Sequence, residues 1–139
     1  MKTYPQKPHI VLVEDEPAHS ELILTALKLV GVQDEILHLE NGAAALDYLE
    51  HFSEGGNRSR SRLFILDLRL PDMDGVEILK RIKASKSLGS VPVVILSTSN
   101  TVEDKSKAIE HGADGYFTKP MDFDGLCKVL GEISSRWLN

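Results

Sequence analysis

Asp67 is the residue of this sequence best placed to do chemistry. It follows four large apolar residues, 63–66, and precedes a segment that contains Pro71 and Gly75. An apolar run that ends in an acid before such a loop predicts a buried strand that delivers a carboxylate to the edge of a sheet. Ligands of open α/β sheets bind at this carboxyl edge, so Asp67 is a candidate site residue.

Other strand-like runs end in polar groups of related chemistry. Glu14 and Asp15 follow the first apolar run, Ser97 ends the fourth, and Lys119 follows the fifth. Parallel strands present their carboxyl ends at one edge of a sheet, so we expect these side chains to lie close together there.

Three of these groups, with one main-chain atom, form a candidate Mg²⁺ site. Mg²⁺ prefers oxygen ligands, keeps several waters and takes one or two direct carboxylates. Asp15 and Asp67 suit direct ligation, and Glu14 would hold a coordinated water. The main-chain carbonyl of Arg69 would complete the coordination sphere.

A cation beside a free carboxylate predicts phosphoryl transfer to that carboxylate. The cation would offset the repulsion between Asp67 and an anionic phosphoryl donor. Lys119 and the hydroxyl of Ser97 would stabilise charge on the transferred group. The product would be an aspartyl phosphate on Asp67.

Each residue also has a plain structural interpretation when it is taken alone. Asp15 could cap the following helix, Ser97 could belong to a turn, and Lys119 could be a surface lysine. Their joint occurrence at four strand ends favours the functional interpretation.

Five strand-like runs alternate with five helical patterns. This alternation predicts an α/β fold with helices on both faces of a doubly wound, five-stranded parallel sheet. The first, third and fourth strands are rich in Val, Ile and Leu and should be buried on both faces, whereas the second should lie at an edge. The expected strands are 9–13, 35–39, 63–67, 91–97 and 115–118, and the expected helices are 17–30, 41–52, 75–85, 102–111 and 122–137.

Length and composition limit the function classes. The 139 residues suffice for one domain, and 42% apolar with 27% charged residues is ordinary for a globular protein. No apolar stretch approaches the roughly 18 residues of a membrane span, and residues 1–8 lack the apolar segment of a signal peptide. The single cysteine, Cys127, is expected to be a buried structural thiol, and we expect a cytoplasmic protein. A net charge of −5 gives no overall attraction to nucleic acid, and the basic cluster 58–62 is expected in a solvated loop.

Four segments together resemble the receiver domain of response regulators, the phospho-acceptor of two-component signalling. The resemblance covers about residues 9–133, with residues 1–8 as an N-terminal tail and 9–139 as the receiver domain. The segments are IVLVEDE at 10–16, LDLRLPDMDG at 66–75, PVVILS at 92–97 and GADGYFTKP at 112–120.

The resemblance implies a flavodoxin-like sheet of order 2-1-3-4-5 and phosphotransfer from a histidine kinase to Asp67 with an essential Mg²⁺. The domain would be a signalling phospho-acceptor that catalyses its own phosphorylation and slow dephosphorylation. Ser97 and Tyr116 match the switch pair of the family, in which Ser97 moves toward the phosphoryl group and Tyr116 turns inward. The bond between Lys119 and Pro120 is similar to one that is cis in the family.

Several positions depart from the commonest pattern of the family. Glu14 stands where aspartate is frequent, and its longer arm favours contact with the metal through water. Thr98 replaces a small residue, which would hinder closure of the aromatic switch, and Met121 replaces an aromatic one. Arg69 offers no carboxylate or amide to orient an attacking water, so we expect a long-lived phosphoryl group whose hydrolysis is tuned by Arg69 and Ser99.

The expected output is docking to another protein. Only two residues follow Trp137, so we expect a stand-alone receiver or phosphorelay intermediate that binds neither nucleic acid nor a membrane directly. The last two helices and the fifth strand would form the phosphate-sensitive surface, and also the surface of a homodimer. The loop 53–62, the run 97–99 and Trp137 are similar to single-domain regulators that partner bacterial phytochromes.

Three other functions share some of these sequence features. A flavodoxin-like electron carrier would bind the FMN phosphate after the first strand, where residues 14–16 are all acidic and would repel it. A hydrolase with an aspartyl nucleophile generally has a second acid where this chain has Arg69. A receiver that has lost phosphorylation would not need the intact acids, hydroxyl and lysine at the strand ends.

Overall fold

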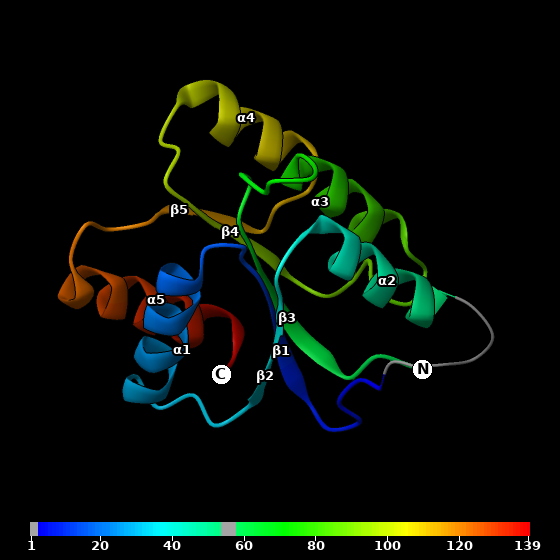
Figure 1. The fold of residues 1–139 in the computed structure, drawn as a ribbon, viewed down its shortest axis with the longest axis horizontal. Coiled ribbons are helices and arrows are strands. Elements are labelled where there is room, and N and C mark those ends of the chain that lie inside the picture. The colour runs from blue at the N-terminus through cyan, green and yellow to red at the C-terminus, as the bar shows by residue number, and fades with distance from the viewer. Residues whose placement is uncertain (1–2, 54–57) are drawn as a thin grey trace.

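The chain folds into a five-stranded parallel sheet between two layers of helices (Figure 1). The computed structural model describes residues 3–53 and 58–139. The strand order is β2-β1-β3-β4-β5, which confirms the expected α/β fold and its sheet order. The elements are β1 (His9–Val13), α1 (Pro17–Leu29), β2 (Glu35–Leu39), α2 (Gly42–Ser53), β3 (Ser61–Leu66), α3 (Gly75–Ala84), β4 (Val93–Ser97), α4 (Val102–Glu110), β5 (Gly115–Thr118) and α5 (Phe123–Trp137).

Two apolar clusters hold the layers together, one on each face of the sheet. On one face, α1 and α5 pack side by side, with Ile23 and Leu130 buried against Leu12 (Figure 1). On the other face, α2, α3 and α4 cover the sheet, with Tyr48 and Ile78 fully buried. All residues of β1 and β4 are buried, whereas β2 is mixed and lies at an edge, as the sequence predicted.

The structure corrects the start of two strands and the end of one, since β3 ends at Leu66 and Asp67 follows it. β3 begins at Ser61, so Arg62 belongs to a strand rather than to the expected loop, and its guanidinium pairs with Asp34 at 2.8 Å. β4 begins at Val93 instead of residue 91, because the N–H of Val91 donates to Leu88 within the preceding turn. Residues 54–57 of the expected loop lie outside the described residues.

Tight backbone contacts fix the helices that border the carboxyl edge. The expected cap of α5 is confirmed, since the Asp122 carboxylate accepts from the N–H of Gly125 at 2.7 Å. Gly75 opens α3 directly against the strand end, where a Cβ atom would lie 2.4 Å from the Asp67 carbonyl oxygen. Only glycine allows this approach, which places α3 beside the acid.

Two further expectations can be compared with the structure. In the described part of the chain, no helix combines the length and apolar character that crossing a bilayer requires. The expectation for Cys127 was too strong, because the residue is only partly buried and packs at the margin of the cluster under α5. Cys127 lies on the side of α5 that faces the edge of this cluster.

Candidate functional site

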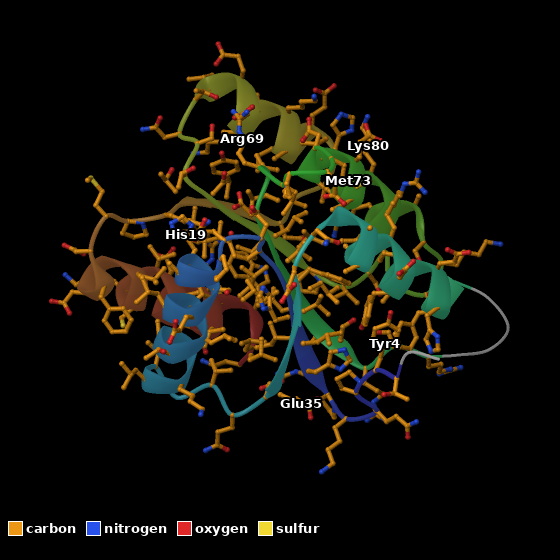
Figure 2. All side chains as sticks on the ribbon, in the orientation of Figure 1. Tyr4, His19, Glu35, Arg69, Met73 and Lys80 are labelled. Atoms are coloured by element: carbon orange, nitrogen blue, oxygen red, sulfur yellow. The ribbon has the colours of Figure 1, made fainter. Side chains whose placement is uncertain are left out.

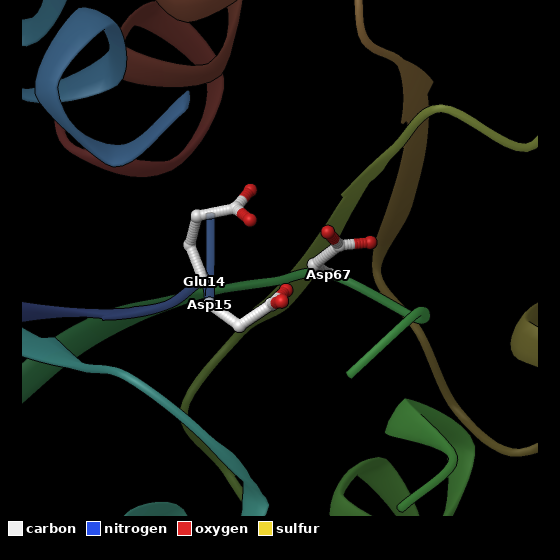
Figure 3. Close-up of side chains that lie close together, drawn as sticks. All are labelled: Glu14, Asp15 and Asp67. Carbon is white, nitrogen blue, oxygen red and sulfur yellow. The ribbon is translucent and has the colours of Figure 1, made fainter. Parts of the chain in front are cut away.

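Three carboxylates gather at the ends of β1 and β3 (Figure 3). Glu14, Asp15 and Asp67 each offer an oxygen atom, and these atoms lie within 4.8 Å of one another. Glu14 and Asp67 are buried, whereas Asp15 is partly exposed. A group of hard oxygen ligands with one side open suits Mg²⁺ or another hard divalent cation.

Lys119 brings a positive charge from the end of β5 into this cluster. Its ammonium donates to Oε1 of Glu14 and to Oδ2 of Asp67, the latter at 3.1 Å. The side chains of Lys119, Glu14 and Asp67 expose only 8%, 1% and 7% of their surface, respectively. The contacts therefore lie in an environment that screens charge weakly. The structure thus brings together the acids and the lysine that the sequence placed at separate strand ends.

The expected cis bond before Pro120 is wrong. The described residues contain no cis peptide bond, so the bond between Lys119 and Pro120 is trans. The trans form is the intrinsically favoured isomer, and the lysine side chain is long enough to reach Asp67 from it. The main-chain N–H of Lys119 is fixed by the carbonyl of Ser97 at 2.7 Å.

Burial opposes the ionised form of one acid. Burial raises the pKa of Glu14 above the ordinary glutamate value, the hydrogen bond and charge of Lys119 lower it, and the negative charge of Asp67 raises it again. The cluster contains three acids, and only Glu14 and Asp67 pair with the Lys119 ammonium, so it has a surplus of negative charge that a bound cation would neutralise.

The loop after β3 holds the second oxygen of Asp67. The main-chain N–H of Arg69 donates to Oδ1 of Asp67 at 3.1 Å, while Lys119 holds Oδ2. Both oxygens therefore have fixed directions. The expected role of the Arg69 carbonyl as a metal ligand stays a prediction.

Ser97 and Tyr116 lie on neighbouring strands, where the switch prediction requires them. Ser97 is fully buried at the end of β4, and its hydroxyl accepts from the N–H of Ser99 at 3.3 Å. The hydroxyl of Tyr116 donates to the carbonyl of Ser99 at 2.7 Å, and burial raises the pKa of Tyr116. The same short segment after β4 thus contacts both residues of the expected pair.

A network that the sequence did not predict joins the loop after β3 to α4. The guanidinium of Arg69 lies 2.6 Å from Oδ2 of Asp104, and the hydroxyl of Ser99 donates to the same oxygen. These contacts, the Ser99 bond foremost, hold the pKa of Asp104 below its usual range. One local signal existed, since Thr101 caps α4 by accepting from the N–H of Asp104 at 3.2 Å.

The sequence also did not predict the role of Asp72, an acid of the loop after β3. The carboxylate of Asp72 accepts from the N–H groups of Gly42 at 2.8 Å and Ala43 at 2.9 Å. These two bonds lower the pKa of Asp72. Asp72 therefore caps α2 from a loop thirty residues away in sequence, which no local pattern indicates.

The cluster opens into a surface groove of about 550 Å³ between the loop after β3 and α4. Asp15, Arg69, Asp104 and Lys107 are among its lining residues. The partly exposed acid therefore faces the side from which another molecule can approach.

Comparison with known proteins agrees with this geometry. The sequence profile described as the response regulator receiver domain matches residues 10–131. This chain belongs to the response regulator receiver domain family. The family assigns the chain to two-component signalling, and the five-stranded fold is the one that solved response regulators share.

Several relatives cover nearly the whole receiver. The probable methanogenesis regulatory protein FilR2 of Methanothrix harundinacea is 44% identical over 93% of this chain and 83% of its own length. The structure of the phosphorylated cyanobacterial phytochrome response regulator RcpA has a TM-score of 0.84 at 36% identity, and covers 97% of this chain and 96% of that one. The Mn²⁺-bound form of Rcp1, a response regulator of Synechocystis, has a TM-score of 0.82 at 38% identity, with coverages of 96% and 95%.

Proposed function

We propose that Asp67 accepts a phosphoryl group from a sensor histidine kinase or a phosphotransfer protein. The observation that carries this proposal is the buried contact of Lys119 with Asp67, beside two further carboxylates at the same edge. A carboxylate with no chemical role would need neither the two neighbouring acids nor the ammonium of Lys119 beside it.

The transfer needs an oxygen of Asp67 aligned with the phosphorus of a phosphohistidine. An O–P bond forms and the P–N bond breaks, and the electron pair stays on the imidazole nitrogen, which takes a proton. The Arg69 N–H and the Lys119 ammonium orient the two carboxylate oxygens before the reaction. The ammonium and the Ser97 hydroxyl then stabilise the negative charge of the phosphoryl oxygens.

The acidic cluster fits the Mg²⁺ that this chemistry requires. Asp15 and Asp67 would hold the ion directly, with Glu14 through water and Arg69 through its main-chain carbonyl. When bound, Mg²⁺ supplies charge neutralisation between the attacking carboxylate and the phosphoryl oxygens.

Phosphorylation would be read out through α4, β5 and α5. Ser97 would turn toward the phosphoryl group, and Tyr116 would leave its bond to the Ser99 carbonyl and turn inward. The contacts of Asp104 with Arg69 and Ser99 give the phosphorylation loop a direct connection to α4. Val102 and Ile109 expose 76% and 49% of their surface on α4, which supports docking of a downstream protein or a homodimer at this face.

The phosphoryl group would be long-lived. The Arg69 side chain is engaged with Asp104 and offers no group that accepts a proton from an attacking water. Self-catalysed phosphorylation and slow dephosphorylation would then be the only reactions of the domain. We expect the protein to act in the cytoplasm.

The kinase partner is proposed to be a phytochrome-type histidine kinase. The likeness to RcpA and Rcp1 over almost the full chain supports this partner. Phosphotransfer from a panel of the host's histidine kinases tests it, and preference for a kinase without a light-sensing module would contradict it. Sedimentation at several concentrations, with and without phosphorylation, tests the homodimer, which a constant monomer mass would exclude.

The proposed function has a direct test with a small phosphodonor. Wild-type protein and Asp67→Asn are incubated with acetyl phosphate and Mg²⁺, and intact mass is recorded over time. We expect one phosphoryl group on the wild type, none on the variant, and none on the wild type when Mg²⁺ is chelated. An unmodified wild type would indicate a receiver that acts by binding alone, and continuous turnover of phosphoesters would indicate a hydrolase.

A further inference from the structure

The Lys119 ammonium has three hydrogen-bond acceptors, of which two are the expected acids. The third is Nδ1 of His19, at 3.1 Å from Nζ. An ammonium group carries three N–H donors and no acceptor, so Glu14, Asp67 and His19 together satisfy it completely. With only 8% of the lysine side chain exposed, water cannot easily replace a missing partner.

The contact also fixes the state of the imidazole. Because the ammonium can only donate, Nδ1 of His19 must present its lone pair, and the ring proton lies on Nε2. A neutral imidazole in this tautomer adds an acceptor beside Lys119 without adding charge to the acidic cluster.

The position of His19 is set by the fold rather than by its own flexibility. It lies in the first turn of α1, at the end of the helix near the carboxyl edge of the sheet (Figure 2). Ile23 and Leu27, one and two turns further along α1, are buried in the core cluster. The Ser20 hydroxyl donates to the Pro17 carbonyl at 3.0 Å and stabilises the first turn.

We infer that His19 is a positioning residue for phosphotransfer, which holds the Lys119 ammonium at Asp67. This inference rests on the proposed function. A lysine side chain has a flexible four-carbon stem, so its ammonium is aimed only if its partners fix it. The bond to His19 comes from outside the acidic cluster, so it persists when Lys119 turns from a carboxylate oxygen to a phosphoryl oxygen.

The test compares two variants of His19 under identical conditions. His19→Leu removes the acceptor, whereas His19→Asn offers a side-chain oxygen in place of Nδ1. Glu21→Gln, at an exposed position of the same helix, is the matched control. Acetyl phosphate with Mg²⁺ is the donor, so that effects on docking of a kinase are excluded.

We expect His19→Leu to be phosphorylated about five- to tenfold more slowly, the effect of one lost hydrogen bond. His19→Asn should recover most of the rate, and Glu21→Gln should match the wild type. The ¹⁵N signal of the Lys119 ammonium should shift in His19→Leu alone, while all variants melt cooperatively.

Two outcomes would overturn the inference alone. One is a wild-type rate in His19→Leu, and the other is an equal loss in His19→Leu and His19→Asn, which would indicate a structural role. A wild type that takes no phosphoryl group would overturn the proposed function and the inference together.

Discussion

The two ends of the sheet both bury polar side chains, but with opposite electrostatics. At the amino end, His9 and Tyr48 are fully buried, and their hydrogen bond is 2.9 Å long. Nδ1 of His9 lies 2.8 Å from the carbonyl of Lys7, and the Tyr48 hydroxyl lies 2.7 Å from the hydroxyl of Ser59. Tyr4 packs edge-on against Tyr48 with ring centroids 5.0 Å apart.

The carboxyl end is arranged in the opposite way. Glu14 and Asp67, both buried, pair with the ammonium of Lys119, and the partly exposed Asp15 lies close to these two acids. Burial raises the pKa of Glu14, so burial opposes the ionised form of this acid. Such an arrangement costs stability unless a cation binds.

This difference separates residues that stabilise the fold from residues that serve chemistry. The buried groups at the amino end satisfy one another by hydrogen bonds and favour one packed state. At the carboxyl end, three acids lie close together although they repel one another, because phosphoryl transfer requires this arrangement. Substitutions at the two ends should therefore change stability and phosphorylation in different combinations.

The largest effect is expected from Lys119→Met. It removes the ammonium that pairs with Glu14 and Asp67, so phosphorylation by acetyl phosphate should slow on the order of 100-fold. Without Mg²⁺ the free energy of unfolding should fall by about 3 kcal/mol, because Glu14 and Asp67 lose their partner. Urea denaturation and intact mass measure both effects, with the exposed Lys128→Met as control. Unchanged stability would mean that the buried ion pairs do not hold the site together.

At the amino end, Tyr48→Phe should lower the free energy of unfolding by about 2 kcal/mol. The loss arises because His9 and Ser59 would each lose a buried hydrogen-bond partner. Phosphorylation of the folded variant should proceed at the wild-type rate. A variant of full stability, or one that is phosphorylated slowly, would remove the contrast between the two ends.

Asp67→Asn should raise stability rather than lower it. Without Mg²⁺ it relieves repulsion from Glu14 and Asp15, and we expect a gain of about 1 kcal/mol. Added Mg²⁺ should stabilise the wild type more than the variant and reduce the gap. A destabilised variant in metal-free buffer would show that the acidic cluster is not under electrostatic stress.

Arg69→Asn should alter the phosphoryl group and leave the fold almost unchanged. The pair of Arg69 with Asp104 is largely solvated, with 65% of the arginine side chain exposed, so its loss should cost less than about 1 kcal/mol. An amide at this position can orient water, and the lifetime of phospho-Asp67 should shorten several-fold. Equal lifetimes of wild type and variant would remove the water-positioning hypothesis.

The smallest effect is expected from Asp72→Ala, which removes two of the hydrogen bonds that cap α2 and leaves the one from Ala44 to Asn41. The pKa of Asp72 is lowered by the N–H groups of Gly42 and Ala43, so its stabilising effect exists above the ordinary aspartate value of 3.8. This contribution is lost as the pH falls through the lower pKa of the folded state. The variant should therefore melt slightly below the wild type near neutral pH, and the difference should vanish in acid. A constant difference at all pH values would exclude an ionised cap.

Strand ends were predictable from the sequence, whereas contacts between loops were not. Apolar runs placed Asp15, Asp67 and Lys119 at one edge, because parallel strands share their direction. The partners of these residues depend on loop conformations, which the periodicity of apolar residues does not predict. Arg69 contacts Asp104 across a gap of 35 residues, and Asp72 contacts Gly42 at the start of α2 across a gap of 30 residues.

His19 was missed for a related reason. A single histidine in the first turn of a helix has no distinctive spacing, and its contact with Lys119 spans most of the chain. The amino-end network of His9 and Tyr48 likewise joins residues 39 positions apart. Only the packing of α1 and α2 on opposite faces of the sheet brings these pairs together.

Asp67, and no other acid of the cluster, is proposed to receive the phosphoryl group. Borohydride reduction of the phosphorylated protein, followed by peptide sequencing, identifies the modified residue, because it converts an aspartyl phosphate into homoserine. We expect homoserine at position 67 alone. Homoserine at position 15, or phosphorylated protein with Asp67 unchanged, would contradict it.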